Sequence, residues 1–457
     1  MTSFHPSVSS SRIHAILFWL TGLSPVFFAA VVWNRSQWLS GPFTWGQSRT
    51  RVVAHSWRFD AGLFYGGMVL LVALAVVVAA MASSSGSRPG RGLISAFLIM
   101  YAGPVISAAF GGHDGLFDWQ LWLAPLLLVA CYLAPPIGLE QMTRLVRPLL
   151  RFYMWGSLAA LAVVPEWAIA PSFINTFSLE WLTPGGRLAG LTNHPISLGV
   201  LAAVALVVEC VPLHRGRGWQ LHCAVAAFVL LLSQTRTAWL AAAAALPFLY
   251  RRDSSRLIQP MVGRALAFGI VVCVAAVMPA VPRQLSAIGD SAEVTSLHGR
   301  TLPWEMALDA FRSNVLLGYG PTLFTDVSSP VHGAFDHAHD QLFQTLATAG
   351  LLGAAGLLVL AGTLTVVAVR TARASAGLSV ALTVLTVVIC VPEAPLRGEG
   401  FTAYLLLTVV LFTVLRSALC DAGAQEAGHV PRPAAAPECA AQRQARIPVP
   451  PEPQPVH

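Results

Sequence analysis

The chain has 457 residues, of which 55% are hydrophobic and only 11% are charged. Soluble domains carry about 25% charged residues, so soluble globular domains are excluded and a polytopic membrane protein is expected. The formal net charge of +7 comes from 28 basic residues, all of them arginine, against 21 acidic ones. Arginine carries a permanent charge on a planar, fork-shaped group. Because every basic residue is arginine, only its place in the chain can show whether it marks membrane topology or binds a ligand.

Twelve apolar stretches predict membrane-spanning helices, because a bilayer core is about 30 Å thick and needs roughly 20 apolar residues per crossing. They cover residues 13–33, 61–82, 93–111, 117–134, 149–170, 195–212, 219–234, 236–250, 263–281, 343–369, 375–392 and 400–416. The expected fold class is all-α, with about twelve transmembrane helices. Eleven would remain if the first stretch is misplaced or re-entrant.

Arginines sort the loops between these stretches. Thirteen of them fall in five short loops on one side, which the positive-inside rule assigns to the cytoplasm. Both termini would then be cytoplasmic. The loop of residues 34–60 should be outside and yet carries four arginines, so the topology of residues 1–60 stays open. Residues 1–416 are expected to form one transmembrane domain, and the Pro/Ala-rich residues 417–457 a disordered cytoplasmic tail.

A large extracytoplasmic loop is expected at residues 282–341. Inside it an amphipathic helix is predicted, with Thr301 as N-cap. Its apolar face carries Trp304, Ala307, Leu308 and Phe311, and its polar face Glu305, Asp309 and Arg312. A glycine turn at Gly318 and Gly320 follows, and then a cluster of titratable residues at the mouth of the next helix: His332, Asp336, His337, His339 and Asp340.

The histidine cluster allows three interpretations. It can be a solvated loop end, which is the ordinary role of polar residues at a helix mouth. It can be a metal site built from His337, His339 and Asp340, although this short motif fixes no coordination geometry by itself. It can also supply a general base, because an imidazole with a pKa near 6.5 can remove a proton from a hydroxyl at neutral pH.

Arg236 lies between two short apolar segments that together span residues 219–249. Each crossing has about 15 residues or roughly 23 Å, so the turn should lie below the outer headgroups, where a charge is costly. Arg236 is then either a snorkelling anchor or a ligand for an anion such as a lipid phosphate. Arg187 and Arg300 lie on the same predicted outer face, and such a group of guanidinium forks suits a pyrophosphate.

These residues resemble the O-antigen ligase and polysaccharide polymerase superfamily. In that family a histidine is followed by Asn, Ser or Gln, then nine residues, then G-x-x-G. Here His339 is followed by Asp340, nine residues, and Gly350 to Gly353. The spacing matches and the residue after the histidine departs. An aspartate at this position is expected to orient the imidazole or raise its pKa.

Three further segments carry the resemblance, which covers about residues 180–416. SQTRTAW is similar to the family's turn around Arg236, and GRTLPW through LLGYG is similar to its loop signature with Arg300 and Trp304. RLAGLTNHPISLG, which begins at Arg187, is similar to the family's R-x-x-G segment before a span. A second departure occurs there, because the family's usual Asn-Pro-Asn is replaced by His194, Pro195 and Ile196.

The resemblance implies a bacterial enzyme of the cytoplasmic (inner) membrane. It would transfer a glycan from an undecaprenyl pyrophosphate-linked donor to a sugar hydroxyl on a lipid or glycan acceptor, outside the cytoplasm. Arg236, Arg300 and Arg187 would bind the pyrophosphate, and His339 would be the catalytic base of a metal-independent inverting displacement. His337, Asp340 and Trp304 would support them. No cofactor, metal or nucleic-acid partner is expected.

Two alternatives remain open at this stage. A polymerase that joins repeat units needs the same donor site as a ligase, and the acceptor groove that separates them cannot be identified in the sequence. A transporter for a small anion or solute belongs to another class. Transporters tend to have polar or broken helices near the membrane midplane, whereas the polar residues here collect at the outer rim.

Overall fold

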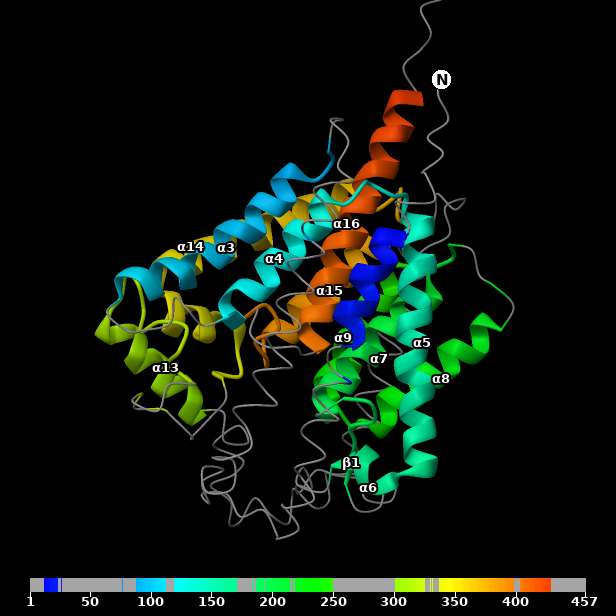
Figure 1. The fold of residues 1–457 in the computed structure, drawn as a ribbon, viewed down its shortest axis with the longest axis horizontal. Helices are drawn as coiled ribbons and strands as arrows, with labels where there is room; N and C mark the ends of the chain where they lie inside the picture. Colours follow the sequence, from blue (N-terminus) through cyan, green and yellow to red (C-terminus); the bar gives the residue numbers. More distant parts are fainter. Residues whose placement is uncertain are drawn as a thin grey trace, which may run out of the picture.

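The protein is described by a computed structural model. It describes residues 12–23, 88–111, 119–170, 186–192, 194–213, 218–249, 301–324, 337–397 and 403–428, with a few single positions between them. Within this part of the chain the structure is helical except for one pair of two-residue strands (Figure 1). The predicted stretches at 61–82 and 263–281 lie outside the described residues.

The helices follow the predicted apolar stretches. After a first helix, Arg12–Leu23, they are α3 (Arg91–Phe110), α4 (Trp119–Leu133), α5 (Leu139–Val163), α6 (Pro165–Ala168), α7 (Pro195–Cys210), α8 (Trp219–Leu232), α9 (Arg236–Ala245), the 3-10 helix η3 (Leu246–Phe248), α13 (Thr301–Ser313), α14 (Gln341–Thr371), α15 (Leu378–Cys390) and α16 (Ala403–Gly428). Strand β1 (Ile169–Ala170) pairs antiparallel with β2 (Arg187–Leu188).

Three of the described helices, α3, α14 and α16, are long and apolar enough to cross a bilayer by themselves. Five others are apolar but shorter: Arg12–Leu23, Leu121–Leu133 in α4, α7, α8 and α15. The all-α, multi-helix character predicted from hydropathy is therefore seen, while the number of twelve spans stays a prediction. Short apolar helices are what the residues 219–249 predicted, because two crossings there share too few residues for a full-thickness span.

The helices form a core around α7 and α16. Nearly every residue of α7 is buried, and so are the first two thirds of α16. Helix α7 packs against α5, α8, α9 and α15, and α16 packs against α4, α5, α7, α14 and α15. Helix α14 runs along α3 on the other side of α16, with α13 beneath their shared end (Figure 1).

Two boundaries differ from the prediction. Helix α5 begins at Leu139 rather than at residue 149, so the arginines assigned to a loop before it lie on its first turns. Arg147 is buried and donates to the backbone oxygens of Val208 and Leu213 at 3.2 and 2.9 Å, and Arg151 forms a two-pronged ion pair with Glu209. These bonds satisfy the charged groups and allow the helix to extend.

The predicted disordered tail is wrong for its first residues, because α16 continues to Gly428. Alanine, glutamine and glutamate favour helix in this extension. Two contacts fix its base: buried Arg416 donates to the Cys131 oxygen at 2.6 Å, and Asp421 accepts from the Leu139 backbone N–H at 3.3 Å. Asp421 thus caps the start of α5. Residues 429–457 lie outside the described residues.

The predicted amphipathic helix is confirmed as α13, with Thr301 as its first residue rather than as a cap before it. Ala307 and Ala310 are buried, and the opposite face carries an exposed ion pair between Asp309 and Arg312. The buried face packs on α14. The helix therefore serves as a cover over the start of α14.

Gly350 of the G-x-x-G motif allows the segment after α13 to contact α14. Gly350 has φ 59° inside α14 and interrupts its helical geometry. The segment after α13 enters this break: the Leu351 and Leu352 N–H groups donate to the oxygens of Val315 and Leu316, and the Tyr319 N–H donates to Ala347. A side chain on Gly350 would meet the Leu316 oxygen at 2.4 Å. The fixed spacing between His339 and Gly350 thus corresponds to the stretch of α14 that separates the histidine loop from this break.

We predict that Gly350→Ala destabilises the protein by about 1–3 kcal/mol, because alanine at positive φ is strained and its Cβ has no room. The measurement is thermal unfolding of the detergent-solubilised protein. Gly362→Ala on the same helix is the matched control, because an added Cβ there meets nothing within 4 Å. Equal melting temperatures for the two variants would contradict this role of Gly350.

Candidate functional site

The first turn of α14 holds two loops together. Asp340 is the N-cap of α14, and its carboxylate accepts from the Phe343 N–H at 2.9 Å. The Gln344 side-chain oxygen accepts from the Ala338 N–H at 2.9 Å, which fixes the histidine loop. The Gln341 side-chain oxygen accepts from the Leu396 N–H at 2.8 Å, which fixes the loop after α15. Residues more than fifty positions apart in the sequence therefore meet here.

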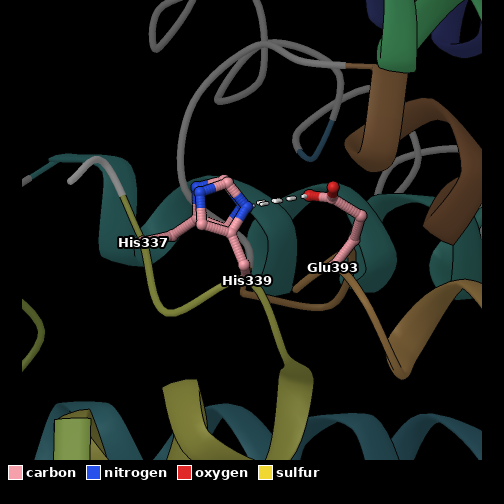
Figure 2. Close-up of side chains that lie close together, drawn as sticks. All are labelled: His337, His339 and Glu393. Atoms are coloured by element: carbon pink, nitrogen blue, oxygen red, sulfur yellow. Dashed lines mark hydrogen bonds and ion pairs between the residues drawn. The ribbon is translucent and has the colours of Figure 1, made fainter. Parts of the chain in front are cut away.

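The meeting point is a cluster of two histidines and one carboxylate (Figure 2). His337 Nε2 lies 3.0 Å from Glu393 Oε2 and shares a hydrogen bond with it, and His339 Nδ1 lies 3.9 Å from the same oxygen. The two imidazole centroids are 4.0 Å apart. The Glu393 side chain is 3% exposed, whereas His339 is 29% exposed. His339 is thus the member of the cluster most open to a ligand.

Burial sets the charges of this cluster. Burial lowers the pKa of His337 to about 4, the Arg397 charge acts in the same direction, and the hydrogen bond to Glu393 opposes both. Burial would raise the pKa of Glu393, but its contacts with His337 and His339 outweigh that effect and hold the pKa well below its usual range. At neutral pH, His337 is therefore a neutral imidazole that donates to an ionised Glu393.

Glu393 was not identified from the sequence. It lies in the segment VPEAP directly after the predicted span 375–392. The available signal was its position at the outer end of an apolar helix, at the same predicted level as the histidine cluster. Only the fold shows that this helix end meets the start of α14.

The second part of the site is the turn before α9. Arg187 lies on β2 and reaches this turn, where its Nε donates to the Ser233 oxygen at 3.1 Å and its Nη2 to the Thr235 hydroxyl at 3.2 Å. The turn packs on Gly199 of α7, where an added Cβ would meet Thr235 at 2.5 Å. Arg236 follows as the first residue of α9 and is exposed.

The charges of Arg236 and Glu393 both act on Arg187. Burial and the charge of Arg236 together lower the pKa of Arg187, to about 10, and the charge of Glu393 opposes them. The N-terminus of a helix carries a partial positive charge, so two guanidinium groups at the start of α9 concentrate positive potential there. Such a place favours an anion, which can accept from arginine forks and helix N–H groups.

Of the remaining residues that the sequence suggested for the site, the structure describes Trp304. Trp304 on α13 faces Phe343 of α14, with ring centroids 5.4 Å apart, and its buried Nε1 has no hydrogen-bond partner among the described residues. Trp304 therefore lies over the first turn of α14. Arg300, His332 and Asp336 lie outside the described residues, so their predicted roles are not tested.

Both departures from the family pattern fall at helix N-caps. Asp340 caps α14, and His194 caps α7, where its Nδ1 accepts from the Ile196 N–H at 3.1 Å. Asn, Ser and Asp are all strong N-cap residues, so aspartate can replace the family's asparagine or serine after the histidine without loss of this bond. The carboxylate that contacts both imidazoles is Glu393.

The cluster also has the donor set of a cation site. One nitrogen from each of His337 and His339 and one oxygen of Glu393 all lie within 4.8 Å of one another. Asp340, which the sequence suggested as the third ligand, is not a member of this group. The expectation that no metal takes part in the reaction is not tested by this geometry.

Part of the chain matches a known protein family. Residues 221–358 match the family model described as O-Antigen ligase. The matched region contains Arg236, Trp304, His337 and His339, together with both glycines of the G-x-x-G motif. Arg187 and Glu393 lie on either side of it. No curated protein matches the chain.

We predict that Asp340→Ala lowers stability by about 1 kcal/mol, because it removes the N-cap of α14, whereas Asp340→Asn keeps it. Thermal unfolding of the purified variants measures the difference. If Asp340→Asn is as destabilised as Asp340→Ala, the charge of Asp340 matters more than its capping bond, and the explanation of this departure fails.

Proposed function

We propose that this chain, whose residues 221–358 match the O-Antigen ligase family model, transfers a glycan from an undecaprenyl pyrophosphate-linked donor to a sugar hydroxyl on the outer side of the cytoplasmic membrane. The observation that carries the proposal is that the fold builds both parts such a reaction needs: a pair of arginines at the turn before α9, and a histidine beside a buried carboxylate at the start of α14. Group transfer from a pyrophosphate requires these two parts side by side.

The arginine part binds the donor. Arg187 is held by the turn at Ser233 and Thr235, so its guanidinium is preorganised, and exposed Arg236 is the partner that can close on a ligand. Together they stabilise the negative charge that develops on the pyrophosphate as it leaves. Arg300 is proposed to contribute a third guanidinium from the segment before α13.

The histidine part accepts the proton. His339 Nδ1 faces Glu393, which leaves Nε2 for the acceptor. The acceptor hydroxyl gives its proton to Nε2 while its oxygen bonds to the anomeric carbon, and the bond from that carbon to the pyrophosphate breaks with its electron pair on the leaving group. The resulting imidazolium is stabilised by the ionised Glu393. A single displacement inverts the anomeric configuration.

His337 and Trp304 support this arrangement. His337 holds the Glu393 carboxylate by its hydrogen bond, so the charge stays directed at His339. Trp304 lies over the first turn of α14 and is proposed to line the acceptor side, because a tryptophan offers both an apolar ring and an N–H donor to a sugar.

A repeat-unit polymerase uses the same donor chemistry and differs in its acceptor. Deletion of the gene separates the two, because loss of a ligase leaves long lipid-linked chains and loss of a polymerase leaves single repeats. A transporter for a small anion remains the candidate from another class. Vectorial uptake into liposomes without glycan transfer would favour it.

We predict that His339→Ala lowers the rate of glycan transfer by about 10²–10⁴-fold, the usual contribution of a general base. The measurement is transfer by membranes containing the variant, with lipid-linked donor supplied. His222→Ala is the control: His222 is also a histidine at a helix end, where it accepts a hydrogen bond from Trp155 on α5. Full activity of the His339 variant would refute the base assignment.

We predict that Arg236→Lys weakens donor use by about tenfold or more, because lysine keeps the charge and loses the two-pronged geometry. The change should appear in the KM for the donor as well as in kcat. Arg312→Lys is the matched control, since Arg312 is exposed and paired with Asp309 on the outer face of α13. Equal donor kinetics for Arg236→Lys and the wild type would show that Arg236 does not grip the pyrophosphate.

A further inference from the structure

The cluster of His337, His339 and Glu393 also has the arrangement of a metal-binding site. Its three donor atoms come from two segments that the first turn of α14 holds in place. Glu393 is buried, and the two imidazoles lie against it from one side (Figure 2). Convergence of two nitrogens and one carboxylate oxygen within 4.8 Å is a geometry that general base chemistry alone does not require.

The separations suit a tetrahedral cation. Zinc binds imidazole nitrogen at about 2.0–2.1 Å and carboxylate oxygen at about 2.0–2.2 Å, so two of its ligand atoms lie roughly 3.4 Å apart. The distances from Glu393 Oε2 to His337 Nε2 and His339 Nδ1 are 3.0 and 3.9 Å, one on each side of that value. The nitrogens of the two histidines lie within 4.8 Å of one another, so the proposal requires the imidazoles to rotate toward the ion.

We propose that His337, His339 and Glu393 form a binding site for Zn²⁺, and that an ion bound there inhibits the transferase. An imidazole that coordinates zinc through Nδ1 carries its proton on Nε2, so His339 Nε2 can no longer accept the proton of the acceptor hydroxyl. Three protein ligands leave a fourth position of the ion open. The binding stands on the cluster geometry alone. The inhibition rests on the proposed function.

The neighbouring charges determine which cations can bind. The charge of Arg397 acts on His337, and the charges of Glu393 and Arg187 act on each other, so two guanidinium groups act on the cluster. A hard cation such as Mg²⁺ or Ca²⁺ needs several oxygen ligands and a negative site, which this cluster does not offer. Zinc gains from the imidazole nitrogens themselves. The arginines are expected to keep the affinity moderate, in the micromolar range.

Zinc binding requires the proton on His337 Nε2, which forms the hydrogen bond to Glu393, to move to another atom. Coordination through His337 Nε2 requires that nitrogen to release its proton, and His337 Nδ1 has no hydrogen-bond partner among the described residues. The proton can move to Nδ1 as the other neutral tautomer. The imidazole then binds zinc with no change in its net charge.

The test is zinc binding to the purified, tag-free protein in detergent, measured by competition with a fluorescent chelator. We expect one zinc equivalent with micromolar affinity, unaffected by millimolar Mg²⁺, and at least tenfold weaker binding in Glu393→Gln and His337→Gln. His222→Gln is the control and should bind like the wild type. Melting temperatures identify any variant that has not folded, and in that case His339→Gln replaces it. Equal zinc affinity in the wild type and a folded cluster variant would overturn the proposal.

Transfer activity distinguishes the two hypotheses. Zinc should inhibit transfer over the same concentration range in which it binds, and a chelator should restore the rate. Binding at the cluster without inhibition would overturn the inhibitory role and speak against His339 as the base, while the binding site stands. Inhibition that persists in a folded Glu393→Gln variant with weakened zinc binding would place the inhibitory ion elsewhere.

Discussion

The hydrogen bonds from the first turn of α14 to its two flanking loops determine where the candidate site forms. Gln344 holds the loop that carries the histidines, and Gln341 holds the loop that carries Glu393. Both glutamines are buried, and a buried polar group is costly unless it is hydrogen-bonded. Asp340 fixes the start of the helix, and the break at Gly350 fixes the next contact, with the segment after α13. The histidines are therefore placed by helix geometry rather than by the loop that carries them.

Glu393 links the two halves of the site through its charge. It is held by His337, it faces His339, and its charge acts on Arg187. Its carboxylate oxygen lies 3.9 Å from His339 Nδ1, on the side of the ring opposite the proposed proton acceptor Nε2. Glu393 also offsets part of the repulsion between Arg187 and Arg236. The same ionised group thus serves the histidines and the arginines, and truncating it should disturb both.

Much of the fold could be predicted from the sequence, because hydropathy and helical spacing are local signals. The positions of α3, α7, α8 and α9 and the amphipathic α13 follow from them. Charged residues misled the prediction where tertiary bonds satisfy them: Arg147 and Glu209 let α5 extend, and Arg416 and Asp421 let α16 continue. Glu393 could not be assigned because its role depends on two helix ends meeting. Conversely, the substitutions Asp340 and His194 looked like changes in chemistry and proved to be N-caps.

The central claim is that the arginines at α9 and the histidines before α14 act on one donor. An experimental structure of the protein with a lipid-linked pyrophosphate donor tests it most directly. We expect pyrophosphate density against Arg187 and Arg236 at the start of α9, with the anomeric carbon directed toward His339. Pyrophosphate density bound elsewhere, or bound at the arginines with the sugar directed away from His339, would contradict it.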